Sequence, residues 1–468
     1  MIIEYILLGI AGLSLALVIA LIAARGARAS TGSGPSLLAR VFTLWLISTV
    51  FFGSRFASVR FAGLFDLTVE RAVFILLLGL MVARLYQRRV AHGMDHTAEL
   101  PLLAFLGLCL ISMSIHGFQA PRPTMSRPWY VFLEGYLLPC ITFYCVKYFL
   151  TDEADLRCVV RGLFWIGAFL VVTSIMEGVG LRQYVLPSYI NDKTFLIHLG
   201  RARGPFLNAA FNGVALCIGL IAGLMLLPLV RFPFSVLHYG VLVLFAPAVF
   251  FTETRSVYLQ FVLIVVGVGV AMRTPFPKWK VYAIPCFLII LAILLNIGRL
   301  ASTERSAGGL AQMEEVSIRF ELARKSLELA GQYPFFGVGL AQFRNVGLAP
   351  LEAIEYQHNH LLGIASELGL TGLATYLAFL VIILRRLFRL LRSMPERPFL
   401  NDNFLFLTGL ALLCNLVSNS FVEPSLHAFA NANFFLFAGI VDRLSNRNKG
   451  LVPGRAVAPQ PETTAEPA

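Results

Sequence analysis

Hydrophobic residues form long runs along this chain, and short polar or basic segments separate the runs. About 13 runs have the length, roughly 17 to 25 residues, that a helix needs to cross a bilayer. The pattern predicts an all-α polytopic membrane protein with about 12–13 transmembrane helices. We expect these helices near residues 5–24, 37–53, 70–84, 100–116, 128–148, 157–177, 209–230, 233–251, 256–272, 281–297, 361–384, 402–418 and 427–442.

The composition agrees with a membrane protein. Of the 468 residues, 57% are hydrophobic and only 14% are charged, and the mean hydropathy is +0.76. Such values are not typical of soluble domains. The net charge of +12 does not indicate nucleic acid, because the basic residues lie in short clusters that mark cytoplasmic helix ends. Four clusters follow apolar runs: Arg25 to Arg28, Arg84 to Arg89, Arg273 to Lys280 and Arg385 to Arg397.

These clusters also predict the topology. Alternating the sides of the runs puts the amino terminus outside, the carboxyl terminus inside, and two longer loops, at about 178–208 and 298–357, on the outer face. We divide the chain into amino-terminal transmembrane helices (1–200), a second membrane region (201–444) that includes the outer loop 298–357, and a cytoplasmic tail (445–468). The tail has no periodic apolar pattern and is expected to be disordered.

The outer loop 298–357 is expected to contain an amphipathic helix in the stretch EEVSIRFELARKSLELAG. Val316, Phe320, Ala323 and Leu327 fall on one helical stripe, which should lie on an apolar surface, either the helix bundle or the membrane. Arg319 lies about 60° from the centre of that stripe and should be half-buried.

Arginines on the outer face are informative because positive residues are depleted there. Arg201 and Arg203 occur in LGRARGPFLNAAFNG, Arg255 in FFTETRSVYLQ, and Arg319 in the loop helix. Arg255 lies in a tight turn between two apolar runs, so its guanidinium group should be at the membrane interface. There it either snorkels to lipid phosphate or binds a lipid-linked diphosphate in bidentate fashion.

A polar cluster precedes the apolar run of YQHNHLLGIASELGLTGLATYLAFL, residues 356–380. We expect Asn359 to cap the helix, which leaves His358 in the loop before it. His360 and Glu367 are two turns apart and share a face, with Glu367 about 10 Å along the helix. The histidines are either an interfacial pair satisfied by water and headgroups or include a general base, since imidazole titrates near neutral pH. On helical phase the partner of Glu367 is His360 and not His358. We therefore expect Glu367 to position other groups and not to transfer a proton.

Four stretches resemble the O-antigen ligase and O-antigen polymerase family. HNHLLGIASELGLTG is similar to its H-N-x-x-L and E-L-G signature, PFFGVGLAQF resembles its P-x-x-G-V-G stretch, and TETRSVYL resembles its threonine/serine-arginine-serine turn. RARGPFLNAAFNG is similar to R-x-x-G-x-x-x-N-P-N, although Ala209, Ala210 and Phe211 replace the proline-containing sequence. The resemblance covers about residues 200–380, with the stretches in the family's order.

The resemblance implies a metal-independent glycosyltransferase of the bacterial inner membrane, without a cofactor, whose catalytic region is 201–444. Such enzymes transfer a glycan from undecaprenyl diphosphate, at the periplasmic face, to a hydroxyl group of a growing glycan, a lipid A core or a protein. Membrane lipids and other polysaccharide assembly proteins are further implied partners. By position in the stretches, the catalytic residues would be Arg255, Arg319 and His358. Other polar residues of the region are expected to contribute to substrate binding: Arg201, Arg203, Asn359, His360 and Glu367.

The chemistry of such a reaction suits these residue types. A lipid diphosphate is a good leaving group, so the protein must hold it, neutralise its developing charge and remove the acceptor's proton. Two arginines and one histidine can do this, and direct attack would invert the anomeric carbon.

Other functions remain open at this point. A transporter or flippase for lipid-linked sugars would place its site near the bilayer midplane, often between inverted repeats, and we see no repeat. A structural subunit of an envelope complex would tolerate changes at the outer arginines. The four stretches do not separate a polymerase from a ligase or a protein glycosyltransferase.

Overall fold

A computed structural model provides the structure of the protein. It describes residues 34–52, 58–61, 65–86, 95–118, 127–150, 152–192, 198–271, 313–343, 346, 357–393, 399–423, 425 and 427–448. The predicted helices at 5–24 and 281–297, and the tail beyond Asn448, lie outside the described residues.

Every predicted apolar run that falls within the described residues forms a helix. In the first part of the chain these are α2 (Leu37–Phe51), α3 (Val69–Tyr86), α4 (Glu99–His116), α5 (Pro128–Tyr130), the π-helix η1 (Val131–Leu137), α6 (Leu138–Tyr148) and α7 (Glu153–Gly178). They are followed by α8 (Ala209–Leu226), α9 (Phe234–Phe250), α10 (Arg255–Ala271), α13 (Met313–Gln332), α14 (His360–Ser393), α15 (Asp402–Asn419) and α16 (Ala428–Asn448).

The prediction of an all-α polytopic membrane protein is confirmed. Among the described residues, 5 helices are long and apolar enough to cross a membrane: Glu99–His116, Pro128–Tyr148, Glu153–Gly178, Ala209–Leu229 and His360–Arg392. Shorter apolar helices occur at Leu37–Phe51, Phe234–Phe250 and Arg255–Gly269. A small antiparallel hairpin between α2 and α3, which the sequence pattern did not predict, pairs β1 (Ser58–Phe61) with β2 (Phe65–Thr68).

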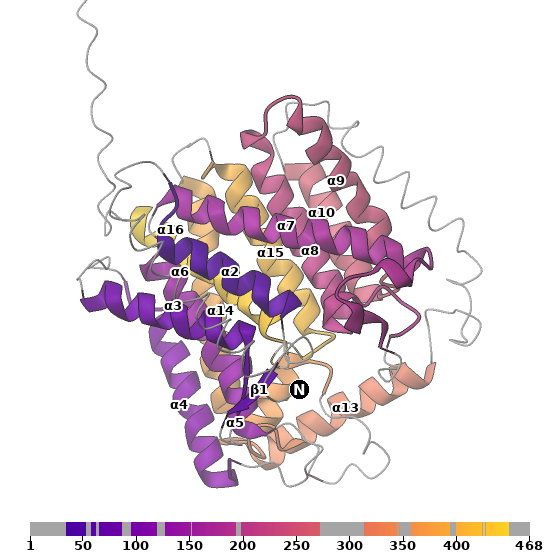
Figure 1. Cartoon of the computed structure of the whole chain (residues 1–468). Coiled ribbons are helices and arrows are strands. Elements are labelled where there is room, and N and C mark those ends of the chain that lie inside the picture. Colours follow the sequence, from indigo (N-terminus) through magenta and orange to yellow (C-terminus); the bar gives the residue numbers. More distant parts are fainter. Residues whose placement is uncertain are drawn as a thin grey trace, which may run out of the picture.

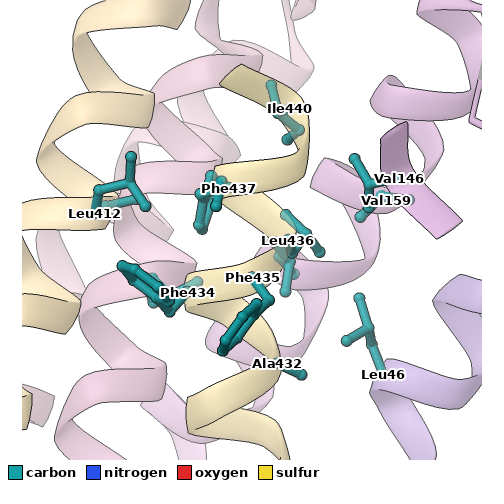
Figure 2. Packing of buried hydrophobic residues seen from close by; sticks show 14 of the residues in the cluster. Leu46, Val146, Val159, Leu412, Ala432, Phe434, Phe435, Leu436, Phe437 and Ile440 are labelled. Atoms are coloured by element: carbon teal, nitrogen blue, oxygen red, sulfur yellow. The ribbon is translucent and has the colours of Figure 1, made fainter. Parts of the chain in front are cut away.

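The core is built around α16, which is surrounded by other helices. Phe434, Phe435 and Phe437 are at most 2% exposed, and Figure 2 shows them between Leu412 of α15 and Val146 of α6. All residues of α16 from Phe429 to Asn446 are buried, the polar ones included, which places this helix in the interior of the bundle.

The amphipathic helix predicted in the loop 298–357 is α13, which lies at the lower edge of the bundle in Figure 1. Its predicted apolar stripe does not pack on the bundle, since Phe320 and Leu327 are 75% and 61% exposed and the side chain of Val316 is outside the described part. The alternative, that the stripe lies on the membrane surface, stays a prediction. The buried face instead carries Leu322 and Leu329, which pack with Val338 and Phe343. The reason is that the turn after α13 folds back and covers a different face.

Helix α14 is broken, not continuous as the sequence pattern predicted. Gly369 has φ 72° and ψ −176°, which separates His360–Leu368 from Leu370–Ser393. At 1.5 Å per residue, Leu370 to Arg385 spans about 23 Å, most of a hydrocarbon core of roughly 30 Å. Glu367 therefore lies beside the break and not deep within one continuous span.

Buried charges join several helices at the end of the bundle where α14 carries its arginines, which we call the basic end. Lys147 of α6 is completely buried and pairs with Glu99 of α4 at 2.6 Å and with Asp442 of α16 at 2.8 Å. Arg386 of α14 pairs with the same Asp442 and, at 3.1 Å, with Asp95. We call these five residues the basic-end network.

The carboxyl-terminal tail starts later than predicted. Helix α16 continues to Asn448, four residues into the predicted disordered segment 445–468. Asn446 accounts for this extension, because its side chain donates to the Asp442 main-chain carbonyl at 2.8 Å and accepts the Asp95 main-chain N–H at 2.8 Å. These hydrogen bonds hold the last turn of the helix in the protein interior.

Candidate functional site

The start of α14 has the local structure that its sequence predicts. Asn359 is the helix cap, since its Oδ1 accepts the Leu362 N–H at 3.0 Å. His358 lies just before the helix, half-buried, with φ 55°. Few non-glycine residues adopt this left-handed conformation, which costs free energy and persists only where neighbouring contacts hold it.

His360 is a buried residue of this cluster. It is 1% exposed, and its Nδ1 is 2.7 Å from Oε1 of Glu423 in the α15–α16 connection. Its ring lies between those of Tyr136 and Tyr376. Burial alone would raise the pKa of Glu423, but the interactions with His360 and Ser425 outweigh burial and hold that pKa below its ordinary value.

Glu367 does not pair with His360, so the pairing expected from helical phase is wrong. Its Oε2 accepts the Ala341 N–H at 2.8 Å, and its Oε1 is 3.5 Å from Nε2 of Gln357. Its main-chain carbonyl accepts the Gly339 N–H at 3.0 Å. Glu367 therefore ties the PFFGVGLAQF turn to α14, in keeping with the positioning role that we expected for it.

The glycines of this junction let the backbones approach closely. A Cβ atom at Gly337 would lie 2.3 Å from the main-chain carbon of Glu367, and one at Gly369 would lie 2.7 Å from that of Phe335. Both glycines have φ near 70°, a region that side chains disfavour. The Leu370 N–H, freed by the break, donates to the Pro334 carbonyl at 2.7 Å.

Replacing Gly369 with alanine is expected to lower the melting temperature of the detergent-solubilised protein. The new Cβ would collide with main-chain atoms, and the left-handed conformation adds about 1–2 kcal/mol. The matched control is Gly107→Ala in α4, where a Cβ meets nothing within 4 Å. Equal melting temperatures for the two variants would show that the break tolerates a side chain.

Arg203, which we expected to bind substrate, is fully buried. Its guanidinium group donates to the carbonyls of Ile190 at 2.7 Å and Asp192 at 2.8 Å. The main-chain N–H of Arg203 donates to Glu177 Oε2 at 3.2 Å. In this structure it supports the loop before α8 and does not face an open surface. Its predicted contact with substrate stays a prediction.

Arg201 precedes Ala202, whose main chain is hydrogen-bonded to the turn before Arg255. Arg201 is half-buried, and the Ala202 N–H donates to the Phe251 carbonyl at 2.8 Å. Arg255 is exposed and is the first residue of α10. The hydroxyl group of Thr254 donates to the Thr252 carbonyl at 2.9 Å, which shapes the short turn that the sequence predicts.

The three proposed catalytic residues lie on or next to helices that are linked by packing. Arg319 is half-buried on α13, as expected, and α13 packs along α14, which His358 precedes. Helix α10, which begins with Arg255, packs against α8 and α15. Helix α15 leads into the connection that contacts Asn359 and His360. Their convergence on one substrate stays a prediction.

The comparison with known families agrees with this arrangement. Residues 240–377 match the model of a family described as O-antigen ligase. This part of the chain is similar to the O-antigen ligase family. The similarity supports a role as a ligase or polymerase in polysaccharide assembly. No match was found among curated proteins.

The match covers three of the four stretches that resembled the O-antigen ligase family. It begins in α9 and ends in α14, so it includes the Arg255 turn, α13 and the His358 segment. RARGPFLNAAFNG precedes it. The buried environment of Arg203 gives this stretch a supporting role in the fold.

Two polar residues next to the site were missed by sequence reasoning. Glu423 and Ser425 lie in the connection between α15 and α16, outside the family match. A carboxylate in a short connection between two apolar runs is a signal that could have been followed. Its partner His360 is 63 positions away, so the pairing itself required the structure.

Proposed function

We propose that this protein transfers or polymerises a glycan from undecaprenyl diphosphate onto an acceptor hydroxyl group. In this proposal the reaction takes place at the periplasmic face of the bacterial inner membrane, in surface polysaccharide biosynthesis. The observation that carries the proposal is the start of α14, where His358 is held in a left-handed conformation immediately before Asn359 and buried His360. This segment lies within the O-antigen ligase match.

Each proposed catalytic residue has a role suited to its place. Arg255 is exposed at a helix end, where its guanidinium group can pair with diphosphate oxygens, and Arg319 supplies a second positive charge. His358 removes the proton of the acceptor hydroxyl. The acceptor oxygen then bonds to the anomeric carbon while the bond to the diphosphate breaks, so the lipid diphosphate leaves with inversion of configuration.

The other predicted site residues divide into two groups. Arg201, beside the Arg255 turn, stays a proposed substrate ligand. Asn359, His360 and Glu367 are proposed to position the site, because their side chains are engaged by Leu362, Glu423 and Ala341 respectively. In this scheme arginines neutralise the leaving group, and no metal ion is required.

A reconstituted reaction tests the proposal. Purified protein in liposomes, given a lipid-linked glycan and a candidate acceptor, is expected to release the lipid diphosphate and to lengthen or transfer the glycan. We expect the same rate with EDTA present, since no divalent cation takes part. Transport of intact lipid-linked glycan across the bilayer, without cleavage, would instead support the flippase alternative.

The basic-end network provides an argument against that alternative. It joins α4, α6, α14 and α16 through buried ion pairs. A flippase of the alternating-access type would have to open this end of the bundle. Separating buried paired charges costs several kcal/mol, which favours a protein that works at the other end.

A further inference from the structure

The connection between α15 and α16, which the structure describes at residues 420–423, 425 and 427, contacts the residues that follow the proposed base. Nδ2 of Asn359 donates to the Ser420 carbonyl at 3.3 Å, and His360 pairs with Glu423 at 2.7 Å. Asn359 and His360 are the two positions directly after His358 in the chain. The connection therefore holds the start of α14 from outside that helix.

The pairing of His360 with Glu423 is buried and closely packed. Glu423 is 7% exposed, and its Oε1 also accepts the Ser425 hydroxyl at 2.7 Å and the Ser425 N–H at 3.4 Å. A buried carboxylate needs such partners, because an unpaired charge is strongly disfavoured in the protein interior. Gly363 allows the approach, since a Cβ there would lie only 3.1 Å from Oε2 of Glu423.

The connection is itself fixed against another helix. A Cβ at Gly135, in the π-helix η1, would lie 2.7 Å from the Ser425 Cβ, so this turn of η1 packs directly on Ser425. Asn431 of α16 donates to the Gly135 carbonyl. Ser425, which donates to Glu423, is thus packed against η1.

We propose that Glu423 is a positioning residue of the catalytic site, which holds His358 in its left-handed conformation through the buried contact with His360. This inference rests on the proposed function, because it assigns Glu423 to the same reaction. The Asn359 cap is one anchor of this backbone. The contact of His360 with Glu423 is a second anchor, one residue after Asn359, and further restricts the backbone next to His358.

Kinetics of Glu423 variants test the inference. Glu423→Ala is expected to lower kcat about 100-fold with the KM of the lipid-linked donor changed less than about threefold, since the base is misplaced and the arginines are intact. Glu423→Gln, which can still accept from the imidazole, should recover most of this loss. Phe421→Ala, an exposed neighbour in the same connection, is the control and should keep the wild-type rate.

A double variant separates positioning from general damage to the fold. In a His358→Ala background, Glu423→Ala should cause almost no further loss, because the residue acts through His358. A further loss of tenfold or more would overturn the inference, as would a wild-type kcat in Glu423→Ala.

A second readout does not depend on activity. Diethyl pyrocarbonate modifies accessible imidazoles, and mass spectrometry reports the rate for each histidine. Glu423→Ala should raise the rate at His360 at least tenfold, because its buried ring loses its partner, while Phe421→Ala should not. An unchanged rate at His360 would contradict the inference. Failure of wild-type protein to transfer glycan would contradict only the proposed function, since this labelling result stands by itself.

Discussion

Asp442→Ala is expected to destabilise the protein severely. Asp442 is completely buried and pairs with both Lys147 and Arg386, which are also buried. Removing one partner of a buried ion pair leaves the other charges without compensation, at a cost of about 3–5 kcal/mol. The measurement is thermal unfolding of the detergent-solubilised protein, followed by the loss of monodisperse material on size exclusion.

The matched control is an ion pair at a more exposed place. Glu153 and Arg157 pair within α7 at 2.7 Å, with side chains 20% and 37% exposed. Glu153→Ala should change stability by less than about 1 kcal/mol, because exposed pairs contribute little. An Asp442→Ala protein as stable as this control would show that the basic-end network does not hold the four helices together.

The length and hydrophobicity of the runs were sufficient to predict the helices. A run that can satisfy its backbone hydrogen bonds only within itself must become a helix in a membrane, and the described runs did so. The break at Gly369 was not visible in this pattern. A single glycine inside an apolar run does not by itself predict a break, because helices tolerate glycine. The break at Gly369 depends on the Pro334–Gly339 turn, whose Pro334 carbonyl accepts the freed Leu370 N–H.

Local features of the candidate site were predicted from the sequence for a simple reason. The cap at Asn359, the loop position of His358 and the half-burial of Arg319 depend on residues only a few positions away. Sequence reasoning thus worked where the deciding neighbour lies on the same helix or in the adjacent turn.

Pairings between distant segments could not be predicted in this way. Helical phase gave His360 and Glu367 a common face, yet the structure supplies Glu423 to one and the Ala341 N–H to the other. Arg203 had no local signal for burial, because its acceptors lie in the loop 182–192. For α13, the turn that follows the helix packs on the face that carries Leu322 and Leu329 and not on the predicted stripe. The outer-face topology and the inner-membrane location stay predictions.

His358→Ala is expected to slow glycan transfer at least about 100-fold, because a general base typically contributes 10²–10⁴ to the rate. Binding of the lipid-linked donor should change little, since Arg255 and Arg319 hold the diphosphate in the proposal. His96→Ala is the matched control: its side chain is 71% exposed, at the basic end of the bundle near Glu99. It should keep the wild-type rate of transfer.

The most direct measurement is the single-turnover rate of lipid diphosphate release in liposomes that contain donor, acceptor and excess protein. With wild-type protein we predict acceptor-dependent release and a product of inverted anomeric configuration, and with His358→Ala a rate at least about 100-fold lower at unchanged donor binding. A His358→Ala protein that transfers glycan at the wild-type rate would contradict the assignment of the base and, with it, the central claim.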